Sequence, residues 1–148
     1  MNTYVDWNDG TIHLISPEGE SLCIIGQYTT DPNDVNFDVP LITEPIISKL
    51  DWEMEQTARH FTDLIQLRLD IFAQTRGYDG ILSACTYVTS TISQFQVEGQ
   101  YCVEMRDATW VAANTILNDV MAGTRPMPTW KEVEAELPAL EWPIVPQK

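Results

Sequence analysis

The strongest constraint on the fold is a change in the spacing of apolar residues near residue 48. Beyond this point apolar side chains recur every three or four residues, the period that places them on one face of an α-helix. The stripe consists of Met54, Ala58, Phe61, Ile65, Leu69 and Phe72, widened by Leu64, Leu67 and Ile71. We therefore expect a helix of roughly 20 residues or more that ends before Gly77, whose backbone freedom suits a carboxy-terminal cap.

A second set of helices is predicted after Gly77. A short helix would begin at Asp79 or Gly80, in the segment ILSACTYV, and a long helix would cover residues 95–122. The stripe of this long helix consists of Cys102, Met105, Thr109, Ala112, Ile116 and Val120. Gly123 follows directly and would end the helix.

The residues after Gly123 predict one more short helix. Thr129 and Glu132 have the T-x-x-E spacing of a capping box, and Pro138 would end the helix that they start. Residues 139–148 contain too many prolines for regular structure. We therefore expect two long and two short helices to form a small antiparallel bundle. Because both long stripes approach heptad spacing, the alternative is that the chain self-associates through a coiled-coil-like seam.

The residues before 48 predict a small β module followed by a linker. Residues 11–15 and 21–28 are rich in β-branched and apolar side chains and flank the turn-forming sequence SPEGE, which is typical of a β-hairpin. A hairpin alone is only marginally stable in water, so it must pack on the helices, on another copy or on a partner. Prolines and acidic residues then predict an extended linker.

The predicted fold class is thus α+β and mainly α. The chain would have three parts: a β-hairpin head at residues 1–30, an acidic linker with prolines at residues 31–47, and a helical module with a proline-rich tail at residues 48–148.

The charge of the chain narrows the choice of partners. It has 22 acidic and 8 basic residues, for a formal net charge of −14. Nucleic acid is not an expected partner, because binding to phosphates depends mainly on lysine and arginine. An acidic inhibitor of a host nucleic-acid enzyme is one alternative, and it would depend on an acidic face that includes Asp31, Asp34 and Asp38.

Neither a membrane span nor an export signal is visible in the sequence. No apolar run approaches the roughly 18 residues that a span needs, and the first residues have no basic start followed by an apolar segment. We therefore expect no membrane partner and a location in the cytoplasm.

No combination of residues in the sequence indicates catalysis or metal binding. His13 and His60 lie far apart, with no second histidine or cysteine at ligand spacing. Cys85 and Cys102 have apolar neighbours, where a buried reduced thiol is the usual state. We expect a non-enzymatic protein with no metal and no cofactor. A small hydrolase with an acidic site between hairpin and helices is the second alternative.

Aromatic residues and arginines indicate a protein-binding function. The chain has five tryptophans, and Trp, Tyr and Arg are the residues that protein interfaces enrich. Trp130 and Trp142 either fold back to cover the helix ends or contact a partner. The candidate partner-contact residues are Trp7, Arg76, Tyr78, Arg106, Trp110, Trp130 and Trp142.

Three segments carry a resemblance to a known family. They are AQTRGYDGILSACTY at residues 73–87, VEGQYCVEMRDATW at residues 97–110, and AGTRPMPTWKEVEAELP at residues 122–138. Residues 48–142 resemble a carboxy-terminal module of small tail-associated proteins of tailed bacteriophages. These are proteins of the tail-fibre assembly (chaperone) kind and related virion accessory proteins.

The resemblance implies a protein that binds the tail fibre or another tail subunit. Such a protein acts in the host cytoplasm during assembly, and then either leaves or is retained in the virion tail. The amino-terminal third, with DGTIHLISPEGESLCIIG, loosely resembles the variable heads that precede this module. The resemblance therefore implies that the head is the specific part and that the helical module is a common adaptor.

Overall fold

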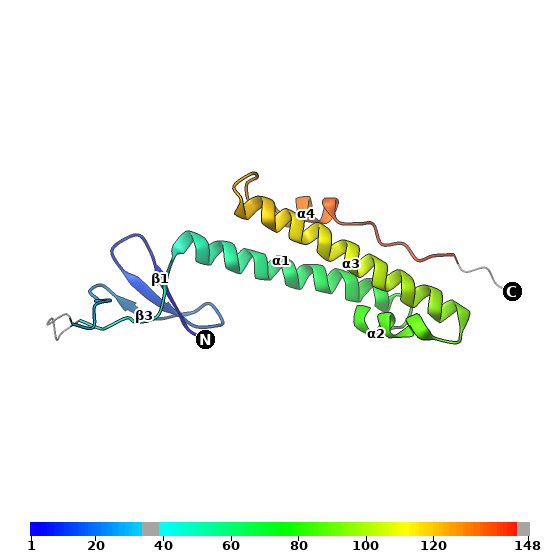
Figure 1. The fold of residues 1–148 in the computed structure, drawn as a ribbon, viewed down its shortest axis with the longest axis horizontal. Helices are drawn as coiled ribbons and strands as arrows, with labels where there is room; N and C mark the ends of the chain where they lie inside the picture. The colour runs from blue at the N-terminus through cyan, green and yellow to red at the C-terminus, as the bar shows by residue number, and fades with distance from the viewer. Residues whose placement is uncertain (34–38, 145–148) are drawn as a thin grey trace. The chain divides into compact units, whose positions relative to one another are not determined.

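The computed structural model describes residues 1–33 and 39–144 and divides into two compact units (Figure 1). We call Met1–Thr57 the strand unit and Ala58–Lys148 the helical unit. Strands precede helices along the chain and helices predominate, which confirms the α+β, mainly α class. Asp34 and Asp38 of the predicted linker lie outside the described residues, as do residues 145–148 of the predicted irregular tail.

The described residues of the strand unit form a four-stranded sheet with the order β3-β2-β1-β4. The strands are β1 (Thr3–Asp6), β2 (Ile12–Ile15), β3 (Ser21–Ile25) and β4 (Ile46–Ser48). The predicted hairpin is the antiparallel pair β2 and β3. The sheet is larger than the predicted two-stranded hairpin. β1 pairs with β2 in antiparallel orientation and with β4 in parallel orientation. The added strands provide the support that an isolated hairpin lacks.

The predicted linker takes part in this unit. Thr29 forms an isolated β-bridge with Leu41. The Thr29 N–H donates to the Pro40 carbonyl, and the Ile42 N–H donates to the Thr29 carbonyl. Residues 46–48, predicted as the end of the linker and the start of the helical module, instead form β4. Ile42 is buried, so the segment does not remain solvated throughout.

Helix α1 (Lys49–Gln74) begins and ends close to the predicted positions. Ser48 caps its first turn, because the hydroxyl accepts a bond from the Asp51 N–H at 3.1 Å and donates one to the Asp51 carboxylate at 2.7 Å. At the other end Gly77 has a φ of 84° and donates its N–H to the Gln74 carbonyl. The prediction that this helix ends before Gly77 is confirmed.

Four further helical segments follow in the described part of the chain, up to residue 144. They are α2 (Ile81–Cys85), the 3₁₀ turn η1 (Thr86–Thr89), α3 (Ser93–Met121) and α4 (Trp130–Glu136). Asp70 caps α2 from a neighbouring element, since its carboxylate accepts the Ile81 N–H at 2.8 Å. A Cβ on Gly80 would lie only 2.7 Å from the same carboxylate oxygen, so a side chain there would displace the carboxylate that caps α2. The capping box of Thr129 and Glu132 is present as predicted.

The core of the helical unit joins α1, α2, α3 and α4. It is formed by Ile65, Leu69, Ala73, Ile81, Ala84, Cys102, Ile116, Val133 and Leu137. Phe72, near the end of α1, contacts Tyr101 in the first part of α3, with ring centroids 5.9 Å apart. Phe61, earlier in α1, lines a cavity with Ile116 in the second half of α3. The two long helices therefore run in opposite directions along this core (Figure 1).

None of the helices in residues 1–33 and 39–144 is both long and apolar enough to cross a membrane.

Candidate functional site: an arginine–aromatic surface

A buried carboxylate organises one end of the helical unit. Glu98 of α3 is only 1% exposed. Its two oxygens accept hydrogen bonds from Arg76 Nη1 at 3.0 Å, Tyr78 Oη at 2.7 Å and Gln94 Nε2 at 3.2 Å. A buried charge is stable only with such partners. Glu98 therefore fixes the turn that follows α1 against α3.

The backbone of α3 comes unusually close to η1 at Gly99. A Cβ at this position would lie 2.6 Å from the Val88 nitrogen and 2.7 Å from the Tyr87 carbonyl carbon. Only glycine allows this approach. Tyr87 of this 3₁₀ turn lies beside Tyr78, with ring centroids 5.3 Å apart in an edge-to-face arrangement.

Trp142 reaches the same end of the unit from the irregular segment after α4. Its ring stacks on Phe72 with centroids 4.2 Å apart and 16° between the planes. Its indole Nε1 donates to Thr75 Oγ1 at 2.8 Å, and the guanidinium carbon of Arg76 lies 5.4 Å from the indole centroid. Trp142 therefore covers the end of α1, one of the two roles that we had predicted for it.

Residues 137–142, which we call the strap, hold Trp142 in this position. The Pro138 carbonyl accepts a bond from Arg68 Nη2 on α1 at 2.8 Å, and the Glu141 N–H donates to Tyr101 Oη on α3 at 2.8 Å. Leu137 is buried in the core. The strap thus has no regular structure, as predicted, but it is bonded to both long helices.

We call the group formed by Phe72, Arg76, Tyr78, Tyr101 and Trp142 the arginine–aromatic surface. Arg76 retains 41% side-chain exposure although it is bonded to Glu98. Burial, together with the hydrogen bond to Glu98 and its charge, raises the pKa of Tyr78 well above its usual value. Tyr78 therefore stays a hydrogen-bond donor at neutral pH. The group combines a fixed cation with flat aromatic side chains, as interfaces commonly do.

The structure brings together only part of the predicted contact residues. Arg76, Tyr78 and Trp142 belong to the arginine–aromatic surface. Arg106 instead pairs with its neighbour Asp107 on α3, at 3.0 Å. Trp110 and Trp130 pack against the hydrophobic core, as Tyr78 and Trp142 also do, and this is the covering role predicted as one alternative for Trp130.

Trp7 lies in the strand unit, in an aromatic cluster of its own. It stacks on His13 with centroids 4.3 Å apart, and its ring lies 5.9 Å from Trp52. Lys49 Nζ is 4.7 Å from the Trp7 centroid. These contacts show that Trp7 is packed within its own unit.

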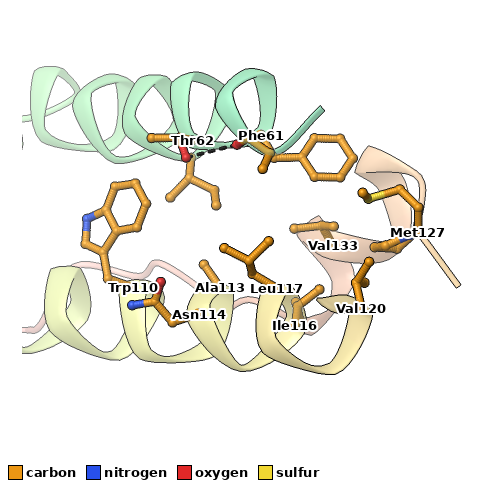
Figure 2. A pocket seen from close by; sticks show the side chains of 13 residues that line it. Phe61, Thr62, Trp110, Ala113, Asn114, Ile116, Leu117, Val120, Met127 and Val133 are labelled. Carbon is orange, nitrogen blue, oxygen red and sulfur yellow. Dashed lines mark hydrogen bonds between the residues drawn. The ribbon is translucent and has the colours of Figure 1, made fainter. Parts of the chain in front are cut away.

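A small apolar cavity lies between α1, α3 and the start of α4 (Figure 2). Its volume is about 60 Å³. Phe61, Leu117 and Val133 point into it from three elements. The only polar side chains of the lining are Thr62, Trp110 and Asn114, and the Thr62 hydroxyl already donates to the Ala58 carbonyl at 3.0 Å. The lining offers no acid, base or charged group for chemistry.

No metal centre is evident in residues 1–33 and 39–144, where no three His, Cys, Asp or Glu side chains gather at one point. Cys102 is buried, as predicted, and Cys85 is half-buried. Burial, with smaller contributions from Cys85 and Glu98, raises the pKa of the Cys102 thiol to about 12. Burial also raises the pKa of Cys85. Both thiols are therefore protonated and poorly reactive at neutral pH. Cys23 is exposed.

Sequence reasoning missed the central residue of this site, Glu98. A signal was present, because Glu98 lies four residues before Cys102 and so falls on the apolar stripe of α3. A charged residue on a buried stripe requires a partner inside the protein. Phe72 was predicted only as a core residue, and Tyr101 was not singled out.

No family model, no curated protein and no solved structure matches the chain.

Proposed function

We propose that the protein is a non-enzymatic bacteriophage tail protein that binds another tail component, the tail fibre foremost. It acts as an assembly chaperone or as an adaptor retained in the virion. The observation that carries this proposal is the state of Arg76: it is bonded to a buried glutamate, lies over Trp142 and remains partly exposed.

An arginine in this state is suited to binding a protein. Free arginine side chains lose conformational entropy when a partner immobilises them. Because the bond to Glu98 already orders Arg76 in the folded protein, much of this loss of conformational entropy occurs during folding and not on binding. Arginine, tryptophan and tyrosine also dominate the small set of residues that supply most binding energy at interfaces.

Two of the three segments that carry the family resemblance meet at this surface. The first segment contributes Arg76 and Tyr78, and the second contributes Glu98 and Tyr101. The third ends at Pro138, where the strap bonds to α1. The meeting of the first two segments on one surface supports a binding role that the module shares with the tail-associated proteins it resembles.

The test is to follow the protein during infection by the phage that encodes it. Quantitative mass spectrometry of purified virions, paired with affinity capture of the tagged chain from infected cells, should detect a tail subunit or fibre. Stoichiometric presence in virions indicates an adaptor. Enrichment of the fibre on the captured chain, with the chain absent from virions, indicates a chaperone. If no tail protein is enriched and virions lack the chain, the proposal is wrong.

Variants of the surface make the test specific. Trp142→Ala should weaken binding to the captured tail protein by more than about fivefold, which corresponds to 1 kcal/mol. Arg106→Ala removes an arginine of the same module that lies outside the surface and should leave binding unchanged. Circular dichroism of both variants shows whether the helices remain folded.

A further inference from the structure

The strand unit has an open sheet edge at β3. One side of this strand pairs with β2, and within the described ranges no strand or loop backbone pairs with the other side. Leu22 is 55% exposed and Ile24 is 61% exposed, and Cys23 between them is exposed as well. An edge strand of this kind presents unpaired N–H and C=O groups that can pair with another strand.

The sequence of β3 lacks most of the features that normally prevent such pairing. Edge strands are usually protected by charged side chains or proline. The segment 21–30 contains neither, although residues before and after it are acidic. One protective feature is present: the register with β2 shifts between Leu14 and Ile15, which leaves Leu22 as an extra residue in β3. Residues 23–25 remain in regular register and are available for pairing.

We infer that two copies of the chain pair through β3 in an antiparallel, two-fold symmetric dimer centred on Ile24. In this register Ile24 lies opposite Ile24 of the second copy, and Cys23 lies opposite Ile25. Directly opposed apolar side chains of neighbouring strands contact each other. A two-fold axis requires such self-complementarity, and the neutral apolar residues 22–25 provide it.

The distribution of charge favours this arrangement over a parallel one. Antiparallel pairing centred on Ile24 places Glu20 opposite Tyr28 and Glu18 opposite Thr30, so no acidic side chain faces another. Parallel pairing in register would place each glutamate beside its own copy. Because the chain carries a net charge of −14, avoiding such repulsion matters for any self-association.

The dimer should be weak and dependent on concentration. A pairing limited to one short strand is smaller than the interfaces of stable dimers. It becomes populated where several copies are held close together, because a high local concentration favours a weak contact. The inference concerns a different unit from the arginine–aromatic surface and does not depend on the proposed function.

The first experiment is sedimentation velocity of the full chain over a range of concentrations. We expect a monomer–dimer equilibrium. Ile24→Lys should raise the dissociation constant of the dimer at least tenfold. Leu82→Lys is the matched control, because Leu82 of α2 has a similar exposure of 63% and lies outside the strand unit. It should leave the equilibrium unchanged.

The second experiment locates the two-fold axis by disulfide formation. In a Cys23→Ser background, Ile24→Cys should form an intermolecular disulfide under mild oxidation at least ten times faster than Leu82→Cys. A chain that stays monomeric at every accessible concentration would overturn the inference. So would a dimer that Ile24→Lys leaves intact, equal oxidation of the two cysteine variants, or open-ended aggregation instead of a discrete dimer.

Discussion

The Tyr78 hydroxyl donates a hydrogen bond of 2.7 Å to the Glu98 carboxylate, across twenty positions of the sequence. This bond links the turn after α1 to the first part of α3. Arg76 bonds to the other carboxylate oxygen, so one buried side chain holds both of the residues that shape this end of the helical unit.

Glu98 should therefore contribute to stability through its hydrogen bonds. Glu98→Gln removes the charge and should lower the free energy of unfolding by about 1–3 kcal/mol, because Tyr78 and Arg76 lose a charged acceptor. Urea denaturation followed by circular dichroism measures this change. Glu104→Gln is the control, because Glu104 is an exposed residue of the same helix. It should lower the free energy of unfolding by less than about 0.5 kcal/mol. Equal effects of the two substitutions would contradict the role of Glu98.

Gly99 should not tolerate a side chain. Gly99→Ala places a Cβ within 2.7 Å of the backbone of η1, so it should lower the free energy of unfolding by about 2–3 kcal/mol although alanine is the better helix former. The same urea experiment applies. Gly26→Ala is the control, because nothing lies within 4 Å of a Cβ there and the backbone is not in the left-handed region. A stabilised Gly99→Ala variant would show that η1 does not pack against α3 as described.

Asp70 should determine whether α2 forms. Asp70→Ala removes the acceptor of the Ile81 N–H and should lower the free energy of unfolding by about 1–2 kcal/mol, as loss of a helix cap does. Hydrogen exchange should show faster exchange at Ile81 in particular. Asp63→Ala, an exposed aspartate of the same helix, should change neither quantity. Unchanged exchange at Ile81 in the Asp70 variant would rule out the cap.

Tyr78 should make the helical unit sensitive to high pH. Its pKa is raised in the folded state, so folding retains a proton that the unfolded chain loses near pH 10. The contribution of Tyr78 is complete below that pH and is lost as the pH rises towards the folded-state pKa. The free energy of unfolding should therefore fall less steeply above about pH 10 in Tyr78→Phe than in the unmodified chain.

Urea denaturation at several pH values between neutral and strongly alkaline conditions tests this expectation. Tyr28→Phe is the control, since Tyr28 is exposed and lies in the strand unit. Parallel pH profiles for the unmodified chain and Tyr78→Phe would contradict the prediction.

The sequence predicted the elements that depend on local patterns. Apolar spacing placed α1 and α3, and the T-x-x-E pattern placed α4, because each of these signals lies within one element. The turn-forming SPEGE likewise located the β2–β3 hairpin. Such features are determined by residues that are neighbours in the chain.

The remaining features depend on contacts between distant residues. β1 and β4 are short, and their pairing joins residues about forty positions apart, so neither has a strong local signal. The choice between covering and interface roles for Trp142 could not be made from the sequence, because it depends on where the strap folds. The role of Glu98 required knowledge of which donors the fold brings to it.

The strap has a consequence for synthesis of the chain. Its bonds to Arg68 and Thr75 join residues that are 70 and 67 positions apart. These bonds cannot form until the ribosome has translated Trp142, so α1 and α3 must remain incompletely covered while they emerge. A premature stop codon shortly after α4 would release a chain with Phe72 and Tyr101 uncovered. Such a product would be a substrate for cellular proteases and chaperones. The helical unit can therefore complete its folding only after residue 142 has been translated.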